Sequence, residues 1–227
     1  MLAGKMLATT SETLAAPIAI AVVADQALTR DALTAVLTES GDVDVLGATT
    51  SIEAAEELLR EERLQVVLVN LPLAPADGGE PAPGIAFIRT AKAQRPDVGV
   101  LSLKRSVDEP LLRAALDAGA DACCLVTTPV ARLRQAIAAV AAGATWLDPE
   151  ISRVLLRPKE RPTLPHLSPR ERAILALIVD GCSNAEIAAQ LGCATATIHT
   201  HILRLFKKLG VRHRVTAAVV ALRAGLV

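Results

Sequence analysis

From residue 17 to residue 143 the chain alternates between short apolar runs and longer amphipathic stretches. In the longer stretches, such as SIEAAEELLREER and PVARLRQAIAAVAAG, apolar residues recur at i, i+3, i+4 and i+7, which is the spacing of one helix face. The short runs predict buried strands, and they cover residues 18–24, 43–48, 65–70, 98–103 and 122–126.

Strand and helix signals alternate five times, and this predicts a parallel sheet with helices on both faces. Right-handed crossovers leave few topologies for such a sheet, and the commonest is the flavodoxin-like strand order 2-1-3-4-5. We therefore expect residues 17–145 to form an α/β domain around a parallel five-stranded sheet.

A proline-rich segment, RPKERPTLPHLSP at 157–169, separates this region from the rest of the chain. Proline removes the backbone donors that a helix needs, so the segment predicts an exposed and semi-rigid linker. The expected organisation is a flexible tail over 1–16, the α/β domain over 17–145, a linker over 146–165 and a second domain over 166–227.

The second domain carries only helical signals. Two capping boxes, each a serine followed three residues later by a glutamate, mark helix starts at Ser168 and Ser183. A third helix is expected from about Thr195, and a fourth from about Val215. The glycines expected to end the first three helices are Gly181, Gly192 and Gly210. Helices joined by such short turns predict an all-α four-helix helix-turn-helix domain.

The bulk composition restricts the class of protein. The chain has 227 residues, enough for two domains, and 52% of them are hydrophobic against 21% charged, which is typical of a globular protein. No apolar run reaches the roughly 18 to 20 residues of a membrane span, and no secretory signal is evident. The four cysteines lack a disulfide-dense pattern, so we expect reduced thiols in a cytoplasmic protein.

The net charge is zero, but the charges are unevenly distributed. Residues 1–157 hold 14 Lys+Arg and 20 Asp+Glu, whereas residues 158–227 hold 10 and 4, together with all four histidines. A basic half attached to an acidic half suggests that only the second half meets a polyanion. Chance variation between two domains is the alternative.

The expected third helix, TATIHTHILRLFKKLG, has an apolar face and a polar face. Small hydroxyl and imidazole donors at its start, with lysines at its end, suit a major groove with phosphates at its rim. A solvated helix face is the alternative interpretation. The candidate DNA-binding residues are Asn184, Thr195, Thr197, His199, Thr200, His201, Arg204, Lys207, Lys208, Arg212 and Arg214.

Residues 167–227 closely resemble the LuxR-type helix-turn-helix domain. The resemblance rests on the LSPRE opening, GCSNAEIA, TIHTH and KLGV, which are spaced over about 60 residues. It implies that the third helix reads DNA and that the fourth dimerises. Two positions depart from the family pattern, because His199 stands where lysine is frequent and Ala194 where a capping serine is frequent. The residues implied at the dimer contact are Val215, Ala218, Val219 and Leu222.

The paired histidines and cysteines of this domain do not predict a zinc site. His199 and His201 are two residues apart, so on a helix they point about 200° away from each other. Cys182 and Cys193 also lack the close spacing of a zinc motif. We therefore expect no bound metal and no other cofactor.

The acidic half resembles the receiver domain of two-component response regulators through ADQALTRDAL, NLP and ALDAGADACCL. Together the two halves resemble the NarL/FixJ-type response regulators. Such receivers imply two acids after strand 1 that bind Mg²⁺ and a phosphorylated aspartate at the end of strand 3. They also imply a Thr or Ser ending strand 4 and a Lys ending strand 5, all at the carboxyl edge of the sheet.

This sequence departs from the receiver pattern at each of those positions. Asp25 is the only acid after the first strand, because Gln26 follows it. Asn70 stands at the phosphoacceptor position, Lys104 at the Thr/Ser position and Val126 at the lysine position. One carboxylate and one amide make a poor Mg²⁺ site. We therefore expect a degenerate pocket that is not phosphorylated, although deamidation of Asn70 or a conformation-preserving substitution is an alternative at that single position.

A loop over residues 71–83, LPLAPADGGEPAP, is about six residues longer than is usual in the family. Long loops beside a site can act as lids, and a neutral surface insertion is the alternative. A lid would favour a small-molecule effector in the old phosphorylation pocket. Its expected lining is Asp25, Gln26, Asn70, Lys104 and Thr127.

The sequence thus predicts a cytoplasmic transcriptional regulator that binds double-stranded DNA as a homodimer and works without phosphotransfer. Either a small-molecule ligand or the protein level would control it. The alternative is a pseudo-receiver interaction module that dimerises with or titrates another regulator. The chain has no G-x-G-x-x-G motif, no Walker lysine and no nucleophile–base pair that can be placed together, so we do not expect an enzyme.

Overall fold

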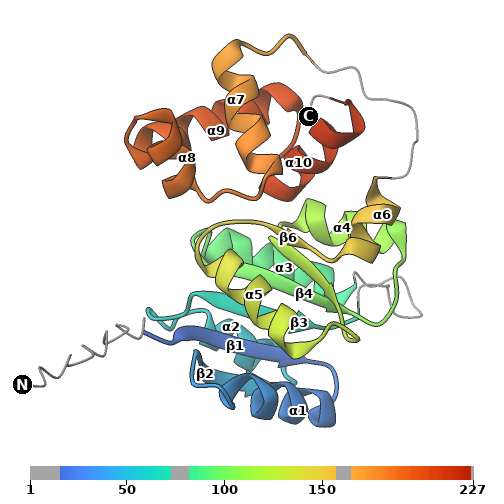
Figure 1. Ribbon diagram of the computed structural model, residues 1–227. Helices are drawn as coiled ribbons and strands as arrows, with labels where there is room; N and C mark the ends of the chain where they lie inside the picture. The colour runs from blue at the N-terminus through green and yellow to red at the C-terminus, as the bar shows by residue number, and fades with distance from the viewer. Residues whose placement is uncertain (1–15, 73–81, 157–164, 226–227) are drawn as a thin grey trace, which may run out of the picture.

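The computed structural model describes residues 16–72, 82–156 and 165–225. An α/β domain and a helical domain lie on top of each other (Figure 1). The expected tail and most of the expected 71–83 loop lie outside the described residues. No helix in the described ranges is long and apolar enough to cross a membrane.

The α/β domain is built on a parallel sheet with the strand order β2-β1-β3-β4-β5-β6. The predicted order of five strands is confirmed, and a sixth short strand extends it at one edge. The strands are β1 Ile18–Ala24, β2 Val43–Thr49, β3 Val66–Asn70, β4 Gly99–Lys104, β5 Ala122–Leu125 and β6 Trp146–Leu147.

The described part of this domain contains six helices, and they cover both faces of the sheet (Figure 1). Helices α1 and α5 lie on one face, whereas α2, α3 and α4 lie on the other. Their bounds are α1 Ala27–Thr38, α2 Ile52–Leu58, α3 Pro83–Gln94, α4 Glu109–Ala118, α5 Val130–Ala141 and α6 Pro149–Leu155.

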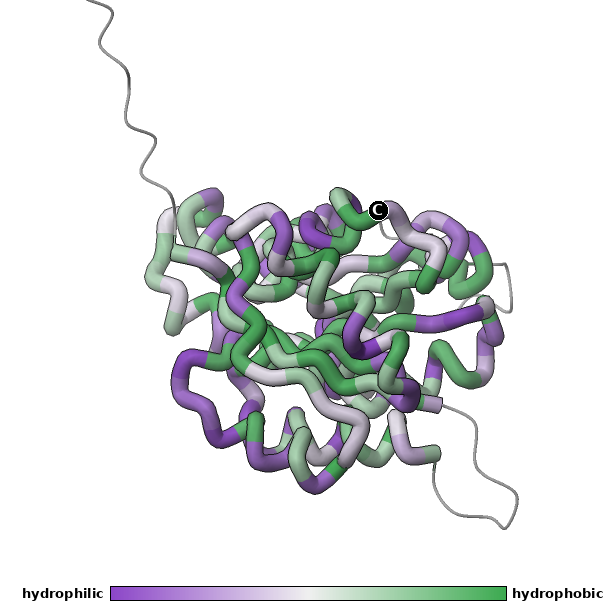
Figure 2. Tube along the Cα trace, turned by 90° about the horizontal axis from the view of Figure 1, so that it is seen from below, coloured by the Kyte–Doolittle hydropathy of each residue, from purple (hydrophilic) through white to green (hydrophobic). Residues whose placement is uncertain are grey.

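The strand side chains alternate between two apolar layers, as the pleat of a strand requires. On β3, Val67 and Val69 join the layer under α2, α3 and α4, while Val66 and Leu68 join the layer under α1 and α5. All four are fully buried, which explains why the strands read as continuous apolar runs. Figure 2 shows these central segments in the hydrophobic colour, with more polar segments around them.

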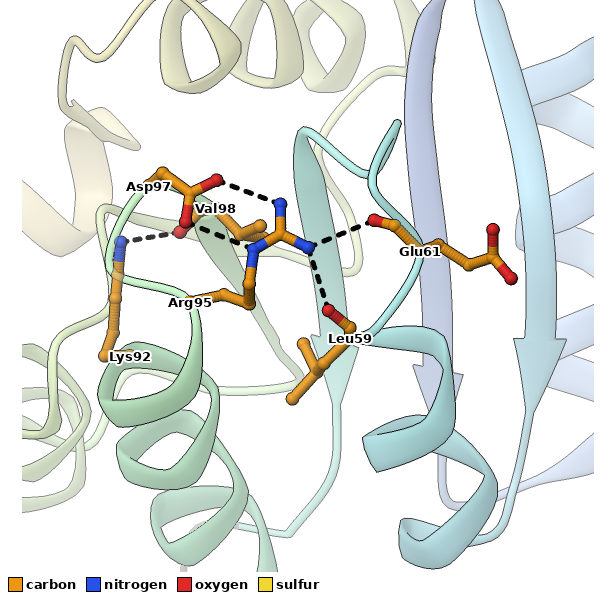
Figure 3. A network of polar contacts seen from close by, with 6 residues as sticks. All are labelled: Leu59, Glu61, Lys92, Arg95, Asp97 and Val98. Atoms are coloured by element: carbon orange, nitrogen blue, oxygen red, sulfur yellow. Dashed lines mark hydrogen bonds and ion pairs between the residues drawn. The ribbon is translucent and has the colours of Figure 1, made fainter.

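Arg95 connects the loop after α2 with the loop before β4, at the amino edge of the sheet (Figure 3). It lies at the end of α3, and its guanidinium donates to the carbonyl oxygens of Leu59 at 2.9 Å and Glu61 at 3.1 Å and pairs with Asp97 at 2.9 Å. Nearby, Lys92 Nζ donates to the Val98 carbonyl at 2.7 Å. These contacts lie at the opposite edge from the predicted pocket, so we assign them a structural role.

The residues after β5 extend the sheet instead of starting the linker. Trp146 pairs with Ala122 and Leu147 with Cys123 in β6. Helix α6 follows, and its Ile151 and Leu155 are fully buried in the apolar layer under α4. The domain boundary expected at residue 145 is therefore about ten residues too early, because residues 146–155 pack with the α/β domain.

The helical domain packs α7 Pro169–Val179, α8 Asn184–Leu191, α9 Thr195–Leu209 and α10 Arg214–Arg223 around its own apolar core. Both predicted capping boxes are present, at Ser168 and Ser183. The expected glycine ends of α8 and α9 are also confirmed, since Gly192 and Gly210 are in the left-handed conformation.

Helix α10 joins the two domains. Its Ala217 and Ala221 are buried in the core of the helical domain, whereas Val215 and Val219 are buried in the layer that contains Leu112, Ile151 and Leu155 of the α/β domain. Those two valines belong to the face that was expected to meet a second copy of the chain. In the single chain that face is largely occupied.

Contacts at its two ends place α10 antiparallel to α4. At one end, a Cβ added at Gly119 would lie 3.0 Å from the His213 imidazole. At the other end, Arg223 donates to the Leu155 carbonyl at 2.7 Å and pairs with Glu109 at 3.4 Å. Burial lowers the pKa of His213 below its ordinary value, although the nearby carboxylate of Asp121 opposes that shift.

Candidate functional site

The ends of β1, β3 and β4 form a cavity at the carboxyl edge of the sheet. Ala24 pairs with Asn70 in the ladder, and the Asp25 amide donates to the Asn70 carbonyl at 3.0 Å. The cavity measures about 270 Å³, and Asp25, Asn70 and Lys104 contribute to its wall. The structure therefore brings together three of the five residues expected in the degenerate pocket.

The other two expected residues lie elsewhere. Val126 follows the last residue of β5, is 43% exposed and lines an apolar groove between α1 and α5. Gln26 is exposed before α1 and makes no capping hydrogen bond. Thr127 lies in a separate shallow cavity with Asp148. The expected positions of Val126, Gln26 and Thr127 in the pocket wall were wrong.

Several residues of the pocket wall were missed from the sequence. The segment between β4 and α4 contributes Arg105, Ser106 and Asp108, and the first turn of α4 contributes Leu111 and Leu112. Asp108 followed by Glu109 and Pro110 is a helix-start signal that could have placed this turn at the cavity. The rest of the wall is Leu71, Pro72 and Leu103.

Lys104 is the most perturbed group of the pocket. It is only 9% exposed, and burial lowers its pKa from 10.5 to about 8. The neighbouring Cys123 is fully buried, and the same cause raises the pKa of its thiol to about 12. Neither residue forms an ion pair with any described group, and Lys104 contributes to the cavity wall without such a partner.

The donor set of the cavity does not fit Mg²⁺. Among the described residues of the wall the carboxylates are Asp25 and Asp108, and the Asp108 carboxylate accepts the Leu111 amide at 3.0 Å to cap α4. The Lys104 ammonium in the same wall adds electrostatic repulsion to the lack of hard oxygen ligands. In the described ranges, no three His, Cys, Asp or Glu side chains are grouped as metal ligands.

The second candidate surface is the start of α9. Thr195, Thr197, His199 and Thr200 are exposed there, while Ile198 and Ile202 between them are buried and fix the helix against the core. Ala194 precedes the helix and gives it no side-chain cap. The polar face predicted from the sequence is therefore presented to solvent.

The predicted phosphate-binding cations differ in their availability. Arg204, Lys207 and Arg212 are exposed, whereas Lys208 pairs with Glu171 of the first capping box at 2.7 Å. That ammonium is the main cause that lowers the pKa of Glu171 to about 2.

The guanidinium of Arg214 is used by contacts within the helical domain. Its guanidinium donates to the Asn184 side chain at 2.9 Å and to the Cys182 carbonyl, and burial lowers its pKa to about 10. The expected phosphate contact of Arg214 does not fit this position. The amide oxygen of Asn184 is occupied by the same contact, and His201 is half-buried.

The comparisons with known proteins cover both domains. Residues 165–221 match the family described as bacterial regulatory proteins, luxR family. The chain is 29% identical over 212 residues to the response regulator protein VraR of Staphylococcus aureus strain Mu3, and the match covers 92% of this chain and 99% of VraR. The VraR of strain MSSA476 matches equally well.

Solved structures with a similar fold include RcsB, a response regulator of Salmonella typhimurium. One RcsB structure gives a TM-score of 0.53 at 23% identity and covers 90% of this chain and 97% of RcsB. A structure described as two RcsB dimers bound to two parallel DNAs has the same TM-score and coverage at 24% identity. These likenesses concern the fold.

Proposed function

We propose that the chain is a response regulator of the NarL/FixJ type, in which a receiver fold precedes a LuxR-type helix-turn-helix domain. In this proposal it regulates transcription by binding double-stranded DNA, without phosphotransfer to its receiver. The observation that carries the DNA-binding part is the exposed start of α9. Its hydroxyl and imidazole donors suit base edges, and the exposed cations Arg204, Lys207 and Arg212 suit the flanking phosphates.

Footprinting of the purified protein across genomic DNA, at low and high salt, tests DNA binding directly. We expect protected sites whose affinity falls steeply with salt, because Lys and Arg contacts to phosphates release counterions. Lys207→Gln should reduce the slope of log binding constant against log salt concentration by about 1. It should weaken binding to all sites by a similar factor. The matched control is Arg60→Gln, which removes an exposed cation of the receiver domain. Absence of protection at low salt would contradict DNA binding.

The absence of phosphotransfer is proposed from the contents of the pocket. An amide at residue 70 does not form a stable acyl phosphate, and Lys104 occupies the wall where a receiver would hold the phosphoryl group. Incubation with acetyl phosphate and Mg²⁺ should leave no hydroxylamine-labile adduct, and Asn70→Asp alone should not create one. A labile adduct on the wild-type protein would contradict the proposal.

The control mechanism follows from the domain contact. Because α10 packs on the receiver, the docked and undocked arrangements would differ in the availability of the α10 face. A ligand in the receiver pocket could shift that equilibrium only if it bound the two arrangements with different affinities. Without such a ligand, the protein level would set the activity.

A pseudo-receiver interaction module is the second candidate, and one surface feature favours it. The groove between α1 and α5 exposes Leu28 at 82%, Val126 at 43% and Val130 at 37%. Exposed apolar patches of this kind often mark protein contacts. Uniformly weak binding to all duplexes, together with tight binding to another regulator, would favour this alternative.

A further inference from the structure

Lys104 is the most deeply buried cation among the described residues, and it differs from the half-buried Lys92, Arg214 and Arg223 in having no partner there. Lys92 pairs with Asp121 at 2.5 Å, Arg214 donates to the Asn184 side chain, and Arg223 donates to the Leu155 carbonyl. Lys104 is 9% exposed but makes no hydrogen bond or ion pair with any described residue. Buried charges in proteins are normally paired, so this ammonium lacks the counterion that its position calls for.

The groups around Lys104 do not supply that counterion. The Asp108 carboxylate is used by the Leu111 amide, and Asp25 lies exposed at the end of β1 without an ion pair to Lys104. Cys123 on β5 remains a thiol, since its pKa is raised to about 12. An anion from solution would therefore be the first group to neutralise Lys104.

The size and lining of the cavity restrict that anion. A volume of about 270 Å³ is below the range of drug-sized ligand pockets, so the occupant is small. Leu71, Leu103 and Leu111 make part of the wall apolar, which suits a short aliphatic group. The wall holds two cations, Lys104 and Arg105, and two carboxylates, Asp25 and Asp108, so it has no surplus positive charge for a second negative charge on the anion.

From these contacts we propose that the receiver pocket binds a small monocarboxylate with a short aliphatic group. The carboxylate pairs with Lys104 and accepts a hydrogen bond from the Asn70 amide, and the aliphatic part lies against the leucines of the wall. This inference deepens the ligand-control part of the proposed function and rests on it for its regulatory meaning. The binding itself does not depend on DNA.

Calorimetric titration of the full chain with 3-methylbutanoate, acetate and inorganic phosphate tests the site. Sodium chloride keeps the ionic strength constant, and each titration is repeated in two buffers of different ionisation enthalpy at pH 8. We expect 3-methylbutanoate to bind at least 10-fold more tightly than acetate or phosphate. We also expect proton uptake on binding, because the anion favours the charged form of Lys104.

Variants separate this site from adventitious binding. Lys104→Met should lower the affinity for 3-methylbutanoate at least 10-fold and remove the proton uptake. Asn70→Ala should lower the same affinity by a smaller factor. Arg60→Met, which removes an exposed charge, should bind as the wild type does. If Lys104→Met does not fold, Lys104→Gln and Asn70→Ala give the same comparison.

Three results would overturn the inference: no heat with any probe up to 50 mM, unchanged affinity in Lys104→Met, or phosphate binding more tightly than both carboxylates. A gel shift on genomic fragments with the same preparation separates the possible failures. If the protein still binds DNA but binds no carboxylate, only the proposed carboxylate site is contradicted. Loss of both would defeat the proposed function as well.

Discussion

Replacing Arg223 with methionine removes the polar contacts between the end of α10 and the receiver domain, and it keeps an aliphatic side chain of similar length. The lost contacts are the 2.7 Å hydrogen bond to the Leu155 carbonyl and the 3.4 Å ion pair with Glu109. Glu109 keeps its pairing with Arg113 at 2.9 Å, so the variant does not leave that carboxylate alone. The change therefore reports on the domain contact more than on receiver stability.

The expected magnitude follows from the geometry of the lost bond. A hydrogen bond from a charged donor contributes about 1.5–3 kcal/mol, and an ion pair already shared with Arg113 adds about 0–1 kcal/mol. A loss of about 2 kcal/mol lowers the docking equilibrium constant roughly 25-fold. If α10 is the dimer face, both protomers must undock, so the apparent dimer constant rises by up to the square of that factor, roughly 600-fold.

Sedimentation equilibrium measures the dimer constant of the wild type and the variant, and small-angle scattering measures the expected expansion of the monomer. Arg113→Met is the matched control, because it removes another ion pair of Glu109, formed within α4. It should leave both readouts near the wild-type values. Equal dimer constants for Arg223→Met and the wild type would refute the idea that docking on the receiver restricts the α10 face.

Three further predictions concern buried ionisable groups. At neutral pH the low pKa of Lys104, about 8 in the folded chain and 10.5 in the unfolded chain, costs roughly 3 kcal/mol of stability. Lys104→Met should therefore raise the midpoint of thermal unfolding at pH 7, and its advantage should shrink as the pH rises from 8 to 10.5, where the unfolded wild type loses its extra proton. Arg214→Ala should lower the unfolding midpoint of the helical domain because the Asn184 contact is lost, whereas Arg212→Ala should leave the midpoint unchanged and weaken DNA binding in a gel shift. Since burial lowers the pKa of docked His213 below 6.5, acidification through that range should favour undocking in small-angle scattering, and His213→Gln should remove this pH dependence.

The periodic pattern was sufficient for the main elements of the fold, because the strands β1, β3, β4 and β5 are buried on both faces and amphipathic helices cover those faces. It did not predict β6, since the two-residue strand Trp146–Leu147 is too short to show a period. The start of α6 did carry a local signal, with Asp148 and Pro149 at a helix start followed by Glu150. The proline-rich segment nearby favoured the linker interpretation.

The positions of individual site residues were less predictable than the elements that carry them. Val126 follows Leu125 at the end of β5, and a shift of one residue moves a side chain to the other face of a sheet. Arg214 has the same charge as Arg212, but the fold places it against Cys182 and Asn184, about 30 residues away in the sequence. Charge alone does not report such a tertiary contact.

Likewise, the sequence showed that α10 has an apolar face but not which surface would cover it. Val215 and Val219 satisfy the requirement of burial equally well against a second copy or against the receiver, and the structure shows the receiver contact. The two arrangements compete for the same side chains. If the chain dimerises through α10, a docked monomer and an undocked dimer would be its two states, which is the minimum that a ligand needs in order to act as a switch.

The pocket and the α10 contact share the first turn of α4. Leu111 and Leu112 line the cavity, and Glu109 in the same turn pairs with Arg223. If a carboxylate at Lys104 changes the position of this turn, it changes the docking of α10, and reciprocity then requires docking to change carboxylate affinity by the same factor. Titration of 3-methylbutanoate into the wild type and Arg223→Met decides the matter. Different dissociation constants for the two proteins would show that the pocket is coupled to the docking of α10. Equal constants would show no coupling and would leave the protein level as the means of control.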